Sequence, residues 1–128
     1  MEEEWLLAHP YELFRLDLQR LSDLCRENKW ILSQAHPFRS GINAQNPALL
    51  EGAEAWNGNP RCENHNEQAR AFIKENGLLP TAGSDFHVVG DETSGVLLQN
   101  EVTANEQLVA ELRRRSHKLF HGNQIIEI

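Results

Sequence analysis

Short apolar runs alternate with helical segments along this chain of 128 residues. The apolar runs have the length of buried strands, and we expect strands at 30–35, 52–57, 79–82, 96–98 and 118–120. An alternation of this kind favours an α/β fold with a largely parallel sheet that is flanked by helices.

The helical segments between these runs are marked by periodic apolar residues and by end signals. We expect helices over 11–28 and 106–115, a shorter helical segment within 47–51, and a helix that Asn64 or Asn66 caps and that ends at Gly77. Gly77 is suited to the left-handed conformation that often ends a helix. A hairpin-like turn at 121–123 and a final pairing strand over 124–128 complete the chain.

Charge and composition exclude several classes of function. With 12 Lys and Arg against 19 Asp and Glu, the formal charge is −7, which disfavours sequence-independent binding of nucleic acid. No stretch approaches the roughly 20 apolar residues of a membrane span. Cys25 and Cys62 lie too far apart to suggest a disulfide framework. We therefore expect one domain, residues 1–128, located in the cytoplasm and not in a membrane.

Two of the expected strands end on side chains that bind metals. His36 follows the run at 30–35 and precedes Pro37, which cannot continue a strand ladder. Asp85 and His87 follow the run at 79–82. Because the ends of parallel strands lie on one side of a sheet, these three side chains can converge. They are ligands suited to Zn²⁺, Mn²⁺ or Fe²⁺.

Further polar residues lie near these strand ends. The carboxamides of Asn57 and Asn66 can orient metal ligands, and Arg39 can neutralise a substrate phosphate. Phe86 alternates with its two polar neighbours and is expected to pack away from the site. Alternation within its strand leaves open whether Glu54 is buried or exposed. The competing interpretation is chance, because a single Asp-x-His or His-Pro pair is common in proteins.

Four blocks of sequence resemble the C-terminal half of PHP (polymerase and histidinol phosphatase) domains, most closely the small metal-dependent phosphoesterases. The resemblance covers roughly residues 30–98 and is carried by blocks that occur in the right order. These blocks are Ala35-His36-Pro37-Phe38-Arg39, Ala53-Glu54-Ala55-Trp56-Asn57-Gly58, Asn66 with Ala69, and Ala82-Gly83-Ser84-Asp85-Phe86-His87.

This resemblance implies a distorted β/α barrel that uses Zn, Mn or Fe to cleave phosphoesters by a metal-activated water. By motif matching, the metal ligands are His36, Asp85 and His87. The resemblance assigns catalysis to Asp85, His87 and Arg39. Glu54, Asn57, Asn66 and Arg39 are expected to support the ligands or to contact the substrate, a phosphoester of a small molecule or nucleotide.

One departure from the family pattern limits these expectations. The N-terminal half of the family begins with a His-x-His strand, and no His-x-His occurs in this sequence. The chain therefore resembles a partial barrel of the PHP type, a half that lacks the paired-metal clamp and is weakly active or inactive alone. Exposed sheet edges favour a homo-oligomer or a complementing N-terminal half as partner.

Two other functions stay open at this point. The chain could be a non-catalytic interaction or regulatory module that is derived from a PHP domain and keeps the site residues as a relic. It could also be a fragment of a metal-dependent amidohydrolase-like barrel, which would act on amides instead of phosphoesters.

Overall fold

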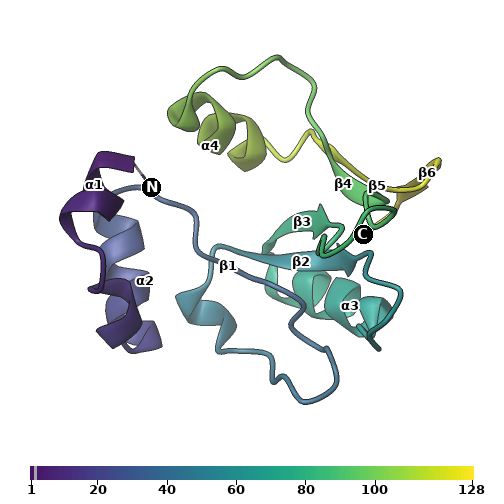
Figure 1. Cartoon of the computed structure of the whole chain (residues 1–128), viewed down its shortest axis with the longest axis horizontal. Coiled ribbons are helices and arrows are strands. Elements are labelled where there is room, and N and C mark those ends of the chain that lie inside the picture. The colour runs from purple at the N-terminus through teal and green to yellow at the C-terminus, as the bar shows by residue number, and fades with distance from the viewer. Residues whose placement is uncertain (2) are drawn as a thin grey trace.

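The computed structural model describes Met1 and residues 3–128, which form a mixed α/β fold (Figure 1). The helices are α1 (Glu3–Ala8), α2 (Leu18–Glu27), α3 (Asn66–Asn76) and α4 (Asn105–Arg113). The strands are β1 (Ser33–Gln34), β2 (Gly52–Asn57), β3 (Leu79–Gly83), β4 (Ser94–Leu97), β5 (Lys118–His121) and β6 (Gln124–Ile126). Two short 3-10 helices, η1 (Leu13–Arg15) and η2 (Pro47–Leu49), complete the described elements.

The strands form two separate three-stranded sheets. The first sheet has the order β1-β2-β3 and is parallel, as the sequence predicts. The second sheet has the order β4-β5-β6 and is antiparallel, so the expectation of one largely parallel sheet is wrong for this half of the chain. The tight turn between β5 and β6, with Gly122 at φ 58°, leaves no room for a crossover and requires an antiparallel pair.

The helix that was expected over 11–28 is interrupted before α2. The backbone of Asp17 is extended, and its carboxylate accepts a hydrogen bond from the N–H of Arg20 at 2.8 Å. This N-cap starts a new helix at Leu18. At the other end, the N–H of Trp30 bonds back to the carbonyl of Cys25 at 2.8 Å, which delays the following strand. The run at 30–35 accordingly contributes only the two residues of β1.

The ends of α3 are set by its neighbours on both sides. Gly77 takes the left-handed conformation (φ 63°) that the sequence predicts. At the start, His65 occupies the cap position without a side-chain cap, so neither expected asparagine caps the helix. The amide of Asn66 instead accepts from the N–H of Asn57 and donates to its carbonyl, both at 3.0 Å. These two bonds join the first residue of α3 to the last residue of β2.

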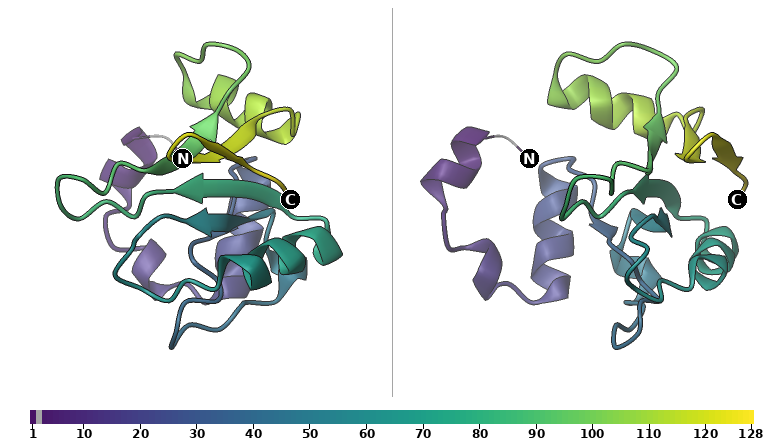
Figure 2. Two further views of the ribbon diagram at one scale, coloured as in Figure 1. Left: turned by 90° about the vertical axis from the view of Figure 1, so that its right-hand side faces the viewer. Right: turned by 45° about the vertical axis from the view of Figure 1, so that its right-hand side comes forward.

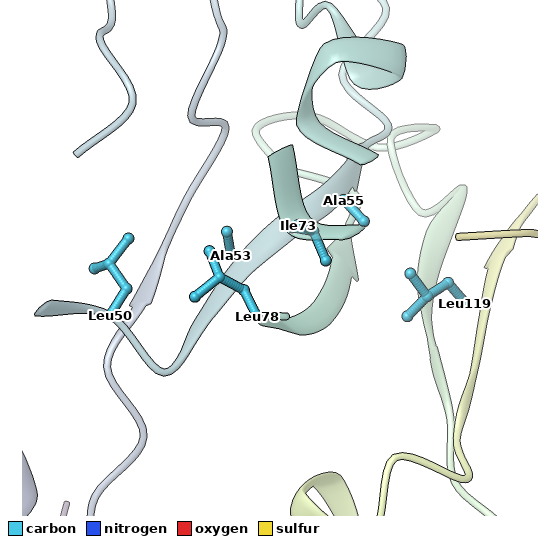
Figure 3. Close-up of a cluster of buried hydrophobic side chains, with 6 residues drawn as sticks. All are labelled: Leu50, Ala53, Ala55, Ile73, Leu78 and Leu119. Atoms are coloured by element: carbon cyan, nitrogen blue, oxygen red, sulfur yellow. The ribbon is translucent and has the colours of Figure 1, made fainter. Parts of the chain in front are cut away.

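The hydrophobic core lies between α3 and β2 (Figure 3). Ala53 and Ala55 on β2 are fully buried, and Ile73 of α3 is 1% exposed against them. Gly52 permits close contact with β3, because a Cβ there would lie 2.7 Å from the carbonyl oxygen of Leu79. The core therefore fixes the relative positions of the three elements that end at the polar edge described below.

The N-terminal segment lies outside this core. Figure 2 shows α1 on the outer side of α2, away from both sheets. No residue of α1 is buried, and Phe14 in η1 is 87% exposed. Among residues 1 and 3–128, no helix is both long enough and apolar enough to span a membrane.

Candidate functional site

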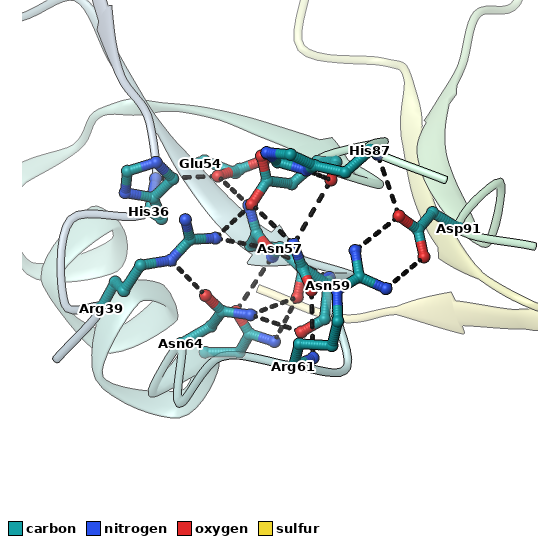
Figure 4. Close-up of polar contacts among 11 residues, drawn as sticks. His36, Arg39, Glu54, Asn57, Asn59, Arg61, Asn64, His87 and Asp91 are labelled. Carbon is teal, nitrogen blue, oxygen red and sulfur yellow. Dashed lines mark hydrogen bonds and ion pairs between the residues drawn. The ribbon is translucent and has the colours of Figure 1, made fainter. Parts of the chain in front are cut away.

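Polar side chains gather where the three parallel strands end (Figure 4). The pairing of Asn57 with Gly83 brings the ends of β2 and β3 together, and the N–H of Gly58 bonds to the carbonyl of Gly83 at 2.9 Å. His36 follows β1, which pairs with the other side of β2. The structure therefore brings the predicted strand ends to one edge of the sheet.

Arg39 connects three parts of this edge. Its Nε donates to Asn64 at 2.9 Å, and its Nη2 donates to Asn57 at 3.1 Å and to Asp85. The Arg39 and Asp85 side chains are only 19% and 20% exposed, so this ion pair is partly shielded from water. The hydrogen bond from Arg39 is the main cause that lowers the pKa of the Asp85 carboxyl, against the opposing effect of burial. Asp85 is therefore a carboxylate at neutral pH.

Glu54 points into the site. Its Oε2 accepts from the N–H of His36 at 2.8 Å and from the amide of Asn57 at 3.0 Å. A Cβ at Gly83 would lie 2.9 Å from the other carboxylate oxygen, Oε1, so glycine leaves the room that Glu54 occupies. The sequence left open whether Glu54 is buried or exposed. In the structure, Glu54 is half-buried and its carboxylate faces the site.

Asp85 changes the direction of the chain after β3. Its left-handed backbone (φ 52°) breaks the strand alternation, and Phe86, which was expected to pack away, is 55% exposed. The Nδ1 of His87 lies 2.7 Å from the carbonyl oxygen of Asp85. Because a carbonyl oxygen only accepts, Nδ1 carries the proton. In a neutral imidazole with this tautomer, Nε2 carries the lone pair that metal binding requires.

His36 contributes a second imidazole to this edge. Its backbone is left-handed (φ 29°), and its buried Nδ1 has no hydrogen-bond partner within the part of the chain that the structure describes. A buried nitrogen of this kind is compatible with a ligand role. Nevertheless, no group of three or more His, Cys, Asp or Glu side chains among the described residues is arranged to hold a metal ion. The donor types fit a divalent metal, but residues 1 and 3–128 do not place three of them together.

Two buried asparagines belong to this site and were not predicted from the sequence. Asn59 donates to the carboxylate of Asp85 at 3.2 Å, and Asn64 donates to the carbonyl of Asn59 at 3.0 Å. Both are less than 10% exposed. Buried amides need hydrogen-bond partners, so a cluster of asparagines after a strand is a signal for a polar network. The sequence Gly58-Asn59-Pro60 is typical of a turn, and nothing in it marks Asn59 as buried.

A second ion pair, which the sequence analysis also missed, lies beside the loop that carries His87. Asp91 is buried and accepts from Arg61 Nη1 at 2.8 Å and Nη2 at 2.6 Å. Its Oδ2 also accepts from the N–H groups of His87 and Val88, at 2.9 and 3.0 Å. The bond from Arg61, followed by the two N–H groups, holds the pKa of the Asp91 carboxyl far below its ordinary value.

This depressed pKa predicts a specific dependence of stability on acid. The stabilisation from ionised Asp91 is complete above the ordinary Asp pKa of about 4 and is lost as the pH falls through the lower folded-state value. We expect Asp91→Asn to unfold more easily than wild type at pH 7, and the difference to shrink below about pH 4. Urea titrations at several pH values measure this, with Asp23→Asn on α2 as control. A difference that stays constant with pH would contradict the assignment.

The fold is mixed α/β, and a polar edge with an ion pair lies at the ends of the parallel strands. Residues 63–116 match the family model described as PHP-associated. This match covers less than half of the chain; it supports a PHP-related C-terminal domain and bears out the resemblance to PHP proteins for that part. It includes Asp85, His87 and Asp91, whereas His36 and Glu54 precede it. No curated protein matches the chain. No solved structure matches it either.

Proposed function

We propose that this chain supplies the C-terminal half of a metal-dependent phosphoesterase site. The observation that carries the proposal is the joined network at the strand ends, where Arg39 bonds to Asp85 and Glu54 bonds to His36. The PHP-associated match over residues 63–116 supports it, because PHP proteins are generally metal-dependent. The proposal includes a half-barrel architecture, in which the parallel sheet is continued by strands from elsewhere.

In this proposal, His36, Asp85 and His87 hold a divalent ion, either Zn, Mn or Fe. A bound ion of this kind supplies a water that is activated for attack on phosphorus. Glu54 fixes the backbone of His36, and the Nδ1 bond of His87 keeps Nε2 free to bind. Among the residues that the structure describes, the bonds of Arg39 use Nε and Nη2, and we assign Nη1 to the substrate phosphate.

The proposal also covers the binding partners of the chain and its location in the cell. Because three donors are not assembled among the described residues, we propose that the remaining ligands come from a complementing N-terminal half or from a second copy of the chain. The substrate class is a phosphoester of a small molecule or nucleotide, and the location is the cytoplasm. Alone, the chain is expected to be weakly active or inactive.

One observation favours a second candidate, a non-catalytic interaction or regulatory module. Arg39 already neutralises Asp85, as expected if the ion pair has become a structural replacement for a metal. Such a module would keep the fold of this edge without binding a metal ion. The two candidates therefore differ in metal content and in turnover.

Elemental analysis combined with a phosphoesterase assay separates these candidates. We expect purified wild type to bind a divalent metal and to hydrolyse bis(p-nitrophenyl) phosphate slowly when Mn²⁺ or Zn²⁺ is added. Asp85→Ala should lose both properties, whereas Asp23→Ala on the exposed face of α2 should keep them. A metal-free wild type without turnover would support the module instead. Turnover of an amide but not of a phosphoester would favour an amidohydrolase-like activity.

A further inference from the structure

The loop between β3 and β4 contains one buried carboxylate. Its neighbours Val88, Val89 and Glu92 are exposed, whereas Asp91 is 3% exposed. A buried charge is unfavourable unless it is paired and hydrogen-bonded. The fork of Arg61 and two backbone N–H groups meet this requirement. Both carboxylate oxygens of Asp91 thus accept hydrogen bonds. None of these bonds comes from the side chain of a predicted metal ligand.

The bonds of Asp91 determine where the backbone of His87 lies. One oxygen, Oδ2, accepts from the N–H of His87 and from the N–H of Val88. These two groups are on either side of the Cα of His87, so the carboxylate fixes the point from which the imidazole projects. The side chain of His87 is itself 62% exposed and has little packing to hold it. Its orientation therefore depends on the backbone and on the Nδ1 contact with Asp85.

Arg61 connects this loop to the loop that follows β2. The N–H of Arg61 donates to the side chain of Asn59 at 3.0 Å, and Asn59 in turn donates to Asp85 at 3.2 Å. A chain of bonds thus runs from Asp91 through Arg61 and Asn59 to Asp85. Asp85 and His87 are two residues apart. Asn59 bonds to the carboxylate of Asp85, and Asp91 bonds to the backbone N–H of His87, a contact that Figure 4 shows.

We propose that Asp91 and Arg61 form a positioning pair that holds His87 in the tautomer with Nδ1 protonated and bonded to the carbonyl of Asp85. The pair acts through the backbone N–H groups of His87 and Val88. A role of this pair in catalysis rests on the proposed phosphoesterase function. The tautomer of His87 can be measured whether or not that function is correct. Loss of the pair lets the loop move, and the Nδ1 bond to the Asp85 carbonyl is then made only part of the time.

Long-range proton–nitrogen NMR of the metal-free chain tests this pair at about pH 8, where imidazole is neutral. We expect wild type to show His87 protonated at Nδ1, with the resonance assigned by its loss in His87→Gln. Asp91→Asn should show a mixture of the two tautomers. The control is Glu51→Gln, which breaks a bidentate pair with Arg113 (2.6 and 2.8 Å) at the opposite end of β2 and should leave His87 unchanged.

A second pair of variants keeps the test decisive if Asp91→Asn does not fold. Arg61→Gln removes the half-exposed partner, and we expect the same mixture of tautomers, with partial recovery in Arg61→Lys. Folded Asp91→Asn or Arg61→Gln with the His87 nitrogen shifts of wild type would overturn the proposal, as would an equal change in Glu51→Gln.

Titration with Zn²⁺ separates failure of this inference from failure of the proposed function. If the pair positions a ligand, Asp91→Asn should bind Zn²⁺ about tenfold more weakly than wild type, as is typical when a group behind a ligand is lost. Equal affinity in the two proteins would contradict the pair. If wild type binds no Zn²⁺, the phosphoesterase proposal fails. The positioning pair is then tested by the tautomer of His87 alone.

Discussion

Asparagine in place of Asp85 is expected to weaken binding of Mn²⁺ or Zn²⁺ at least about tenfold, measured by isothermal calorimetry. The substitution keeps the shape of the side chain and removes the only anionic oxygen atoms that it offers to a metal. It also leaves the guanidinium of Arg39 without its counter-ion in a partly shielded position. That unpaired cation repels an incoming metal ion, so both effects act in the same direction.

A matched change elsewhere distinguishes loss of a ligand from a general change in charge. Asp23→Asn removes one negative charge from the exposed surface of α2, where Asp23 accepts a hydrogen bond from Gln19. We expect its metal affinity to equal that of wild type. If Asp85→Asn binds the metal ion as tightly as wild type and Asp23→Asn do, Asp85 is not a ligand.

Removal of the Ile73 side chain is expected to lower the free energy of unfolding by about 2–5 kcal/mol. Ile73 is 1% exposed and packs from α3 onto the small residues Ala53 and Ala55 of β2. Because these alanines lie in the interior of a strand, the sheet cannot close over the cavity that Ile73→Ala creates. Domains of this size are stable by only about 5–15 kcal/mol, so the change is large.

Urea denaturation measures this loss, and Val89→Ala is the control. Val89 is 91% exposed, and its truncation is expected to change stability by less than about 0.5 kcal/mol. Since α3 begins with Asn66, which bonds to Asn57 at the site, Ile73→Ala should also broaden the NMR signals of Asn57. Similar stabilities for the two variants would mean that α3 does not form the core with β2.

The parts of the fold that the sequence predicted well are those with strong local signals. Gly52 and the turn after Asn57 delimit β2 at the predicted residues, and Gly77 ends α3 as expected. The start of α2 was misjudged because Leu13 and Leu16 continue the apolar period across the break. The short-range bond of Asp17 to Arg20 decides the boundary instead.

The candidate site was only partly predictable for a related reason. His36 and Asp85 lie at strand ends that a parallel sheet brings together, and this follows from the order of elements. The partners of these residues come from loops, where no periodic pattern marks a contact. The bond from Arg39 to Asp85 spans 46 residues, and the sequence did not indicate that Arg39 is a counter-ion within the site. Likewise, nothing in the polar sequence of residues 88–94 marks Asp91 as buried.

Anomalous diffraction from crystals of the chain grown with Zn²⁺ tests the central proposal most directly. We predict a Zn²⁺ peak at the ends of the parallel strands, within about 2.0–2.2 Å of an Asp85 oxygen and of His87 Nε2 or a His36 ring nitrogen. Arg39 and Asn59 bond to Oδ2 of Asp85, so we expect the ion to bind the other carboxylate oxygen, Oδ1. A map at saturating Zn²⁺ in which this edge is empty would contradict the account.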